Sequence, residues 1–195
     1  MDQVGGGCVS MMLERLNRIA RGRFGARLWS ILSPRWTLPS GLEVTVASKA
    51  EWVIYNDIFV DGEYDVPIQH AVAHAAAGSV ILDIGANVGY FALRFADRWL
   101  RDRDDPFNLI GVEGSPRTFP TLEARLRQQR LEGKLDYRFG LAGRRSGEAR
   151  ISSSEFHVTD SIVTGDSGSG SSVPFLVLTA VVPAEARIAL LMCDI

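Results

Sequence analysis

The chain has 195 residues, enough for one domain with a sizeable core. Its 46% hydrophobic and 23% charged residues fit a globular protein, and a net charge of -2 gives no sign of a nucleic-acid or anionic-membrane partner. The cysteines, Cys8 and Cys193, are too few for a disulfide framework or a zinc site. We therefore expect a reduced, cytoplasmic protein, with Cys193 buried in the apolar run "IALLMCDI".

Residues 1–35 form the first segment. Within it, residues 11–32 place apolar side chains near helical spacing with arginines between them, which predicts a basic amphipathic helix. Such a helix can lie on a membrane surface, but we favour a helix packed on the domain or a loosely held arm. No apolar run approaches the ~20 residues that span a bilayer, so we expect no stable membrane insertion.

Residues 36–78 form a lead-in segment. The stretch "SGLEVTVAS" at residues 40–48 alternates apolar and polar residues, as a half-exposed strand does. Residues 51–65 mix aromatic, β-branched and acidic side chains, which predicts a short helix or strand followed by a loop. Pro67 is expected to open a helix that runs through residue 77 and ends at Gly78.

A strand–helix pattern begins at residue 79. Residues 80–83 form an apolar strand that ends in an acid, and helical periodicity follows at residues 88–96. Residues 109–113 repeat the apolar strand with a terminal acid. Ser115 then predicts the N-cap of a second helix, with Pro116 at its first position.

Two further strands are predicted, at residues 135–139 and, buried, at residues 188–194. The intervening stretch "GEARISSS" is expected to form a strand or hairpin, and residues 164–172 a loop. Strands that alternate with helices predict an α/β fold with a doubly wound, mainly parallel sheet, in which helices cover both faces of short apolar strands. Residues 79–195 are thus the expected cofactor-binding part.

The turn after the first of these strands indicates a ligand site, because ligands of open parallel sheets lie beyond the carboxyl ends of the strands. Gly85 can take dihedral angles closed to other residues, and Gly89 would let the new helix pack close to the strand. The helix N-terminus would offer N–H groups to a carboxylate or phosphate. Glu113, at the end of the next strand, could accept hydrogen bonds from both hydroxyls of a ribose.

Two kinds of adenosine cofactor fit this outline: a dinucleotide and S-adenosylmethionine. Asp83, two residues before the first glycine, would repel a pyrophosphate but could help to hold an ammonium group. Asn87 stands where the dinucleotide fingerprint has a glycine. Both features favour S-adenosylmethionine. A nicotinamide-dependent oxidoreductase and a non-catalytic nucleotide-binding module are the alternatives.

The sequence also resembles a known family. "VILDIGANVGYFALRFA" looks like the first motif of class I S-adenosylmethionine-dependent methyltransferases, and in detail it is similar to the FkbM family. "VEGSPRTFPTLEARL" resembles that family's second motif, and "ALLMCDI" the start of its "LLKIDVEG" motif. "LPSGLEVTVAS" and "NDIFVDGEYD" resemble its lead-in, so the similarity covers residues 37–195. Methionine and cysteine replace the usual Lys-Ile before Asp194, and the Glu-Gly after it and the later strands are absent.

The resemblance implies roles for several residues. Glu113 would bind the ribose, and Ala142 would lie near the adenine. Asp194 is the candidate catalytic residue near the methyl acceptor, or simply the polar end of a strand. Tyr64 could cover the cofactor with an aromatic face that favours the sulfonium, although ordinary loop packing explains it equally well. The methionine end of the cofactor would be lined by Asp83, Gly85, Ala86, Asn87 and Gly89.

The family further implies O-methylation of a hydroxyl on a sugar or natural product, that is, a small-molecule or glycan acceptor. We expect the chain to be truncated after its fourth core strand and inactive as a fragment. That strand should lie beside the first one, at an open sheet edge through which chains could associate. We expect no metal, because His70 and His74, although spaced like a metal pair, lack a third ligand.

Overall fold

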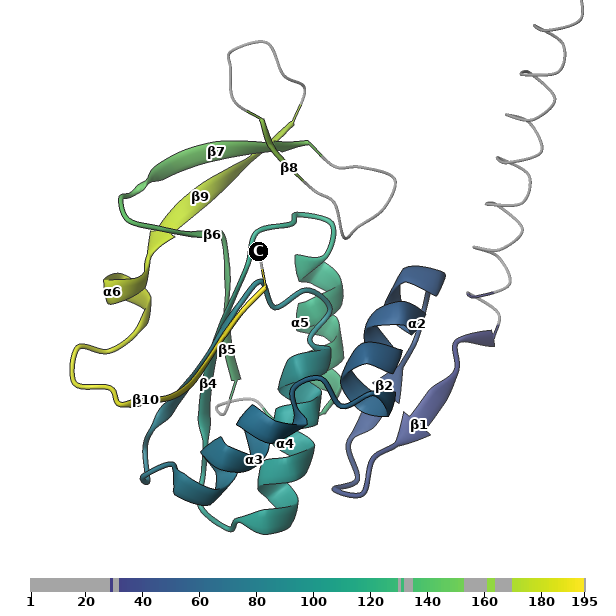
Figure 1. Cartoon of the computed structure of the whole chain (residues 1–195). Coiled ribbons are helices and arrows are strands. Elements are labelled where there is room, and N and C mark those ends of the chain that lie inside the picture. Colours follow the sequence, from purple (N-terminus) through teal and green to yellow (C-terminus); the bar gives the residue numbers. More distant parts are fainter. Residues whose placement is uncertain are drawn as a thin grey trace, which may run out of the picture.

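A computed structural model describes residues 29, 32–129, 131, 135–152, 161–163 and 170–194. The predicted basic helix therefore lies almost wholly outside the described residues. At the centre of the described part is a parallel sheet with the strand order β10-β3-β4-β5 (Figure 1). Its strands are β3 (Val80–Ile84), β4 (Asn108–Glu113), β5 (Leu135–Phe139) and β10 (Ile188–Cys193).

One face of this sheet is covered by the helices that follow β3 and β4. These are α4 (Tyr90–Asp102) and α5 (Phe119–Gln128). Helix α3 (Asp65–His74), which comes before β3 in the chain, packs on the same face, and the apolar side chains of the three helices contribute to the larger core cluster. The chain runs from β3 outward to β5 and then returns to place β10 on the other side of β3. This reversal defines a Rossmann-like, doubly wound α/β fold, as predicted. No helix of the described part is long and apolar enough to cross a membrane.

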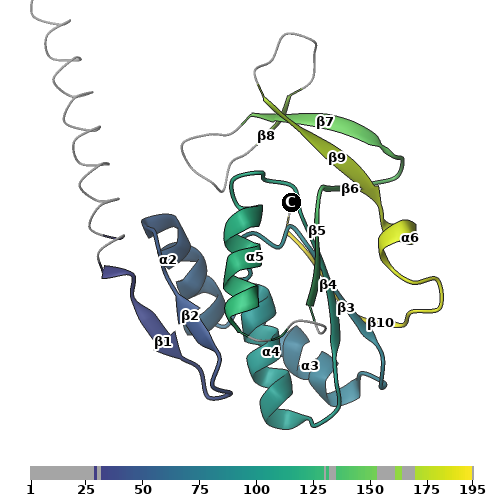
Figure 2. The same ribbon diagram turned by 180° about the vertical axis from the view of Figure 1, so that it is seen from behind.

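The return connection contains a second sheet, where the sequence predicted only a strand or hairpin and a loop. Its strands are β6 (Leu141–Gly143), β7 (Gly147–Ser152), β8 (Ser161–Val163) and β9 (Ser171–Val177), in the order β6-β9-β7-β8. Both ribbon views place it beyond the carboxyl ends of the parallel strands (Figures 1 and 2). Its β9 leads into α6 (Leu178–Val181), whose Val181 packs on the sheet face opposite α4.

The lead-in segment forms a hairpin and a helix. Strands β1 (Arg35–Thr37) and β2 (Glu43–Thr45) pair antiparallel, so the strand expected over residues 40–48 is much shorter. Helix α2 (Lys49–Tyr55) follows and continues into the π-helix η1 (Asn56–Val60). The Ser48 side chain caps α2 by accepting a hydrogen bond from the Glu51 N–H at 3.1 Å. Residues 51–60 are therefore helical.

Two predicted helix boundaries are wrong, for identifiable reasons. Helix α3 ends at His74 because Ala75 is extended, and the Arg103 guanidinium, rather than Gly78, caps its end by donating to the Ala75 carbonyl at 2.8 Å. Helix α5 begins at Phe119 because Ser115 closes a separate turn, accepting from the Thr118 N–H at 3.2 Å.

Strand β10 pairs in parallel with β3, as expected, and is the last strand on that side of the sheet in the described part. The prediction of a buried strand is wrong, because Ile188 and Leu191 are 50% and 56% exposed. The thiol of Cys193, predicted to be buried, is also exposed. With β3 as its one described neighbour, β10 lacks the cover that a central strand receives.

We expect this edge to mediate self-association at high protein concentration, because unpaired backbone groups and exposed apolar side chains favour strand addition. Replacing Leu191, at the exposed edge, by lysine should lower the average molar mass measured by sedimentation equilibrium. Val66→Lys is the matched control, since Val66 is 77% exposed but lies on α3. Equal masses for the wild type and L191K would contradict the prediction.

Candidate functional site

A cavity of about 420 Å³ opens at the carboxyl ends of β3 and β10, where the strand order reverses. This is the place at which open α/β sheets bind ligands. One wall is the turn after β3, and another comes from α2 and η1. The lining residues that carry the argument are Lys49, Val53, Asp57, Glu63, Tyr64, Gly85, Ala86, Asn87, Val88, Phe91, Met192 and Asp194.

The turn after β3 depends on left-handed backbone angles. Gly85 and Gly89 have φ of +84° and +85°, which glycine adopts without strain. Asn87, where the dinucleotide fingerprint has glycine, is also left-handed, with φ of +50°. Asparagine is among the few other residues that enter this region readily, so the turn keeps its shape without a third glycine.

The N–H groups of this turn bind protein acceptors. Gly85 and Ala86 both donate to the Val112 carbonyl oxygen, at 2.9 and 3.1 Å. Asn87 donates to the Glu113 carboxylate at 2.7 Å. These three amides tie the turn to the end of β4. The binding of an anion at the N-terminus of the helix that follows the turn stays a prediction.

Gly89 has a packing role, but not the one expected. A Cβ atom at this position would lie 2.7 Å from Cδ1 of Leu122 on α5. The glycine therefore lets the start of α4 approach α5, whereas we expected a close approach to the strand.

Glu113 lies at the end of β4, as predicted, and is buried. One carboxylate oxygen accepts from the Asn87 N–H and the other from the Ser115 N–H, each at 2.7 Å. The binding of a ribose by this carboxylate stays a prediction. Glu113 also joins the first turn to the second, which sequence analysis did not foresee.

Asp83 is fully buried beneath the cavity, on the sheet face covered by α4 and α5. It pairs in register with Gly111 on β4, and Gly111 pairs with Tyr137 on β5. The Tyr137 hydroxyl reaches across the glycine and donates to Oδ2 of Asp83 at 3.3 Å, while Oδ1 has no hydrogen-bond partner in the described part. Burial raises the pKa of Asp83 to about 7; the Tyr137 hydrogen bond opposes this rise, and the nearby Glu113 and Asp194 carboxylates add to it.

Tyr64 and Asp194, the two remaining candidates near the methionine end, both line the cavity. The Asp194 N–H donates to the Ile84 carbonyl oxygen at 2.9 Å, which fixes the residue at the end of β10. Burial raises the pKa of Tyr64, and the carboxylates around it, those of Glu63 and Asp194 first among them, raise it further. Ala142 does not line this cavity; it packs against the smaller core cluster on the other face of the sheet.

The cavity is electrically asymmetric. Three carboxylates line it, from Asp57, Glu63 and Asp194, against the one ammonium group of Lys49. Sequence analysis missed the wall that α2 provides. The pattern Ser48-x-x-Glu51 could have placed the start of that helix.

A metal site has no support in the described part. It contains no group of three or more His, Cys, Asp or Glu side chains that could hold an ion. His70 and His74 stack on each other, with ring centroids 4.4 Å apart, and the His74 Nδ1 atom lies 2.9 Å from the His70 carbonyl oxygen.

Strand order and site together define a Rossmann-like α/β protein with a cavity at its switch point. No family profile matches the chain, and no curated protein matches it. Among solved structures it is similar to the YcgJ protein of Bacillus subtilis, with 18% identity and a TM-score of 0.29 over 40% of this chain and 30% of that chain. It is also similar to TYW2 of P. horikoshii in complex with MeSAdo, with 16% identity and a TM-score of 0.32 over 51% of this chain and 33% of that chain.

The chain thus matches about a third of the length of each of these two structures. At such identities the likeness concerns the fold alone. The resemblance to the FkbM family stays a prediction from the sequence motifs.

Proposed function

We propose that this chain binds S-adenosylmethionine in the cavity at the ends of β3 and β10 and belongs to a methyltransferase that acts on a hydroxyl group. The observation that carries the proposal is the composition of that cavity. It combines the glycine turn with three carboxylates, one ammonium group and several apolar or aromatic side chains.

The residues present fit the methionine end of this cofactor. Its sulfonium and ammonium groups are cations, and the carboxylates of Asp57, Glu63 and Asp194 favour cations over a pyrophosphate. The amides of Gly85, Ala86 and Asn87 already bind Val112 and Glu113, which leaves these three unavailable to a pyrophosphate. The buried Oδ1 of Asp83, which has no hydrogen-bond partner in the described part, is an acceptor for the ammonium group. A dinucleotide therefore fits less well.

S-adenosylmethionine supplies, when bound, a methyl group on a sulfonium that leaves as a neutral thioether. The chain's own residues then have two tasks. The cavity walls, including Tyr64 and Phe91, exclude water and align the acceptor oxygen with the methyl carbon. Asp194, which lines the cavity after the end of β10, takes the proton of the acceptor hydroxyl as the new C–O bond forms. A sugar or natural-product hydroxyl is the acceptor class that the family resemblance implies.

Binding measurements test the cofactor. In isothermal titration calorimetry the 195-residue chain should bind S-adenosylhomocysteine and not NAD. Glu113→Ala should weaken this binding by ~1–3 kcal/mol, because it removes a buried acceptor of both turn and ribose. Tight NAD binding, or unchanged affinity in E113A, would count against the proposal.

Two control variants show whether a loss of affinity in E113A comes from a lost contact with the ligand or from damage to the turn. Glu113→Gln keeps one acceptor oxygen for the backbone amides and should bind more tightly than E113A. Asp102→Asn removes a carboxylate at the far end of α4, where it pairs with Arg98, and should leave affinity unchanged.

A further inference from the structure

The cavity depends on the position of α2. Lys49, Ala50, Val53 and Ile54 of this helix line it together with Gly85 and Asn87 of the turn. The helix belongs to the lead-in segment and is no part of the parallel sheet. Some interaction must therefore hold α2 at a fixed distance from the turn, or the cavity loses a wall.

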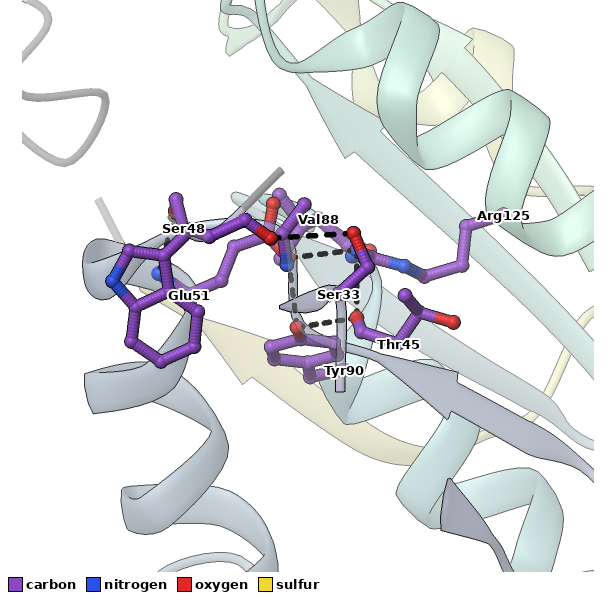
Figure 3. A network of polar contacts seen from close by, with 9 residues as sticks. Ser33, Thr45, Ser48, Glu51, Val88, Tyr90 and Arg125 are labelled. Atoms are coloured by element: carbon purple, nitrogen blue, oxygen red, sulfur yellow. Dashed lines mark hydrogen bonds and ion pairs between the residues drawn. The ribbon is translucent and has the colours of Figure 1, made fainter. Parts of the chain in front are cut away.

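A buried carboxylate on α2 provides one end of that interaction (Figure 3). Oε2 of Glu51 accepts from the Arg125 guanidinium at 2.8 Å and lies 2.9 Å from the Tyr90 hydroxyl. It also accepts from the Ala47 N–H at 3.0 Å. Tyr90 is the first residue of α4 and Arg125 lies on α5, so one carboxylate joins α2 to both helices.

Arg125 provides the other end. Its Nη1 donates to the Val88 carbonyl oxygen at 2.6 Å, and its Nη2 donates to the Thr45 carbonyl oxygen at 3.1 Å as well as to Glu51. The guanidinium also lies 4.7 Å from the centre of the Tyr90 ring. Val88 is part of the glycine turn and lines the cavity. A planar group with several fixed donors suits this task, which an ammonium group cannot perform in the same way.

Stability alone does not account for such a pair. A buried ion pair loses hydration on folding, and well-packed apolar residues in its place are often equally stabilising. What apolar residues cannot provide is directed hydrogen bonding to the Val88 carbonyl and to the Glu51 carboxylate at the same time. Val88 lines the cavity itself, and Glu51 belongs to α2, whose neighbouring residues line it.

We propose that Arg125 is a positioning residue that couples the α2 wall of the cavity to the glycine turn, so that a ligand in the cavity orders both walls together. The identity of the ligand rests on the proposed function. The coupling of the two walls does not, and it can be measured in the unliganded protein.

The experiment compares Arg125→Met with the wild type by hydrogen exchange and calorimetry. In R125M the amides of α2 should exchange about tenfold faster, with those of β3 and β4 unchanged. S-adenosylhomocysteine should protect α2 in the wild type but not in R125M, and its affinity should fall by about tenfold or more. Arg127→Met is the matched control, because Arg127 lies on the same helix but pairs with Glu123 at the surface.

A double variant, Glu51→Leu with Arg125→Met, addresses misfolding, because it leaves no unpaired buried charge. If this variant folds, keeps slow exchange in α2 and binds S-adenosylhomocysteine as the wild type does, the pair is structural only and the proposal is overturned. Uniformly faster exchange in all elements of R125M would overturn it too. A wild type that fails to bind S-adenosylhomocysteine, with α2 still released in R125M, would refute the proposed function and leave the coupling standing.

Discussion

The unliganded protein should lose stability as the pH rises from about 4 to about 7, through the single carboxyl group of Asp83. This group is fully buried, and burial raises its pKa to about 7. Tyr137 donates one hydrogen bond to it, which opposes the rise, and Oδ1 has no hydrogen-bond partner in the described part. The fold therefore tolerates the neutral acid much better than the anion.

The direction of this change in stability with pH follows from proton linkage. In the unfolded chain Asp83 has an ordinary pKa near 4, so between about 4 and 7 the folded state binds the extra proton. The neutral acid's contribution is fully present below the unfolded pKa and is lost as the pH rises through the folded pKa. A rise of about three units corresponds to about 4 kcal/mol at about 1.4 kcal/mol per unit.

Urea denaturation of the wild type and Asp83→Asn at pH 5 and pH 8 measures this effect. The amide cannot ionise, and the other titrating groups are common to both proteins. The stability difference should therefore shift by about 3 kcal/mol in favour of D83N between the two pH values. If the stability difference between the wild type and D83N is the same at pH 5 and pH 8, Asp83 is not held neutral in the fold.

The strand–turn–helix core could be predicted from the sequence, because its signals are local. Apolar runs ending in Asp83 and Glu113 placed both acids at strand ends, and the glycine spacing placed the turn. The position of β10 beside β3 followed from the chain order of the resembled fold. What these acids contact was not predictable, because their partners come from other strands or other turns.

The wall of the cavity that α2 provides could not be predicted from the periodicity of the sequence. Residues 51–60 lack a clean period of either helix or strand, and the π-helical turns of η1 displace the side chains from regular helical spacing. The burial of Glu51 and Arg125 gave no periodic signal either, because both are charged residues. Their pairing joins segments 74 residues apart in the chain. The exposure of β10 likewise depends on its neighbours in the sheet and not on its own apolar sequence.

The arrangement around Asp83 also depends on one glycine, Gly111, in the middle of β4. A Cβ atom built there would lie 2.0 Å from Cε1 and 2.4 Å from Cδ1 of Tyr137. Real contacts never come so close, and the ring lies directly across the glycine because its hydroxyl reaches Asp83 on the next strand. Because Gly111 has no side chain, the Tyr137 ring can lie against the sheet at this position.

Gly111→Ala should destabilise the protein by roughly 1–3 kcal/mol or more, because the added methyl group must displace the ring or the strand. Urea denaturation in two backgrounds tests the cause. In Tyr137→Val, which removes the ring, the same substitution should cost much less, so that a double-mutant cycle gives a coupling between the two sites of about 1 kcal/mol or more. Equal costs in both backgrounds would place the strain elsewhere. Displacement of the ring also removes the hydroxyl that stabilises the Asp83 anion, so in G111A the pKa of Asp83 should rise further and the loss of stability with pH should extend above pH 7.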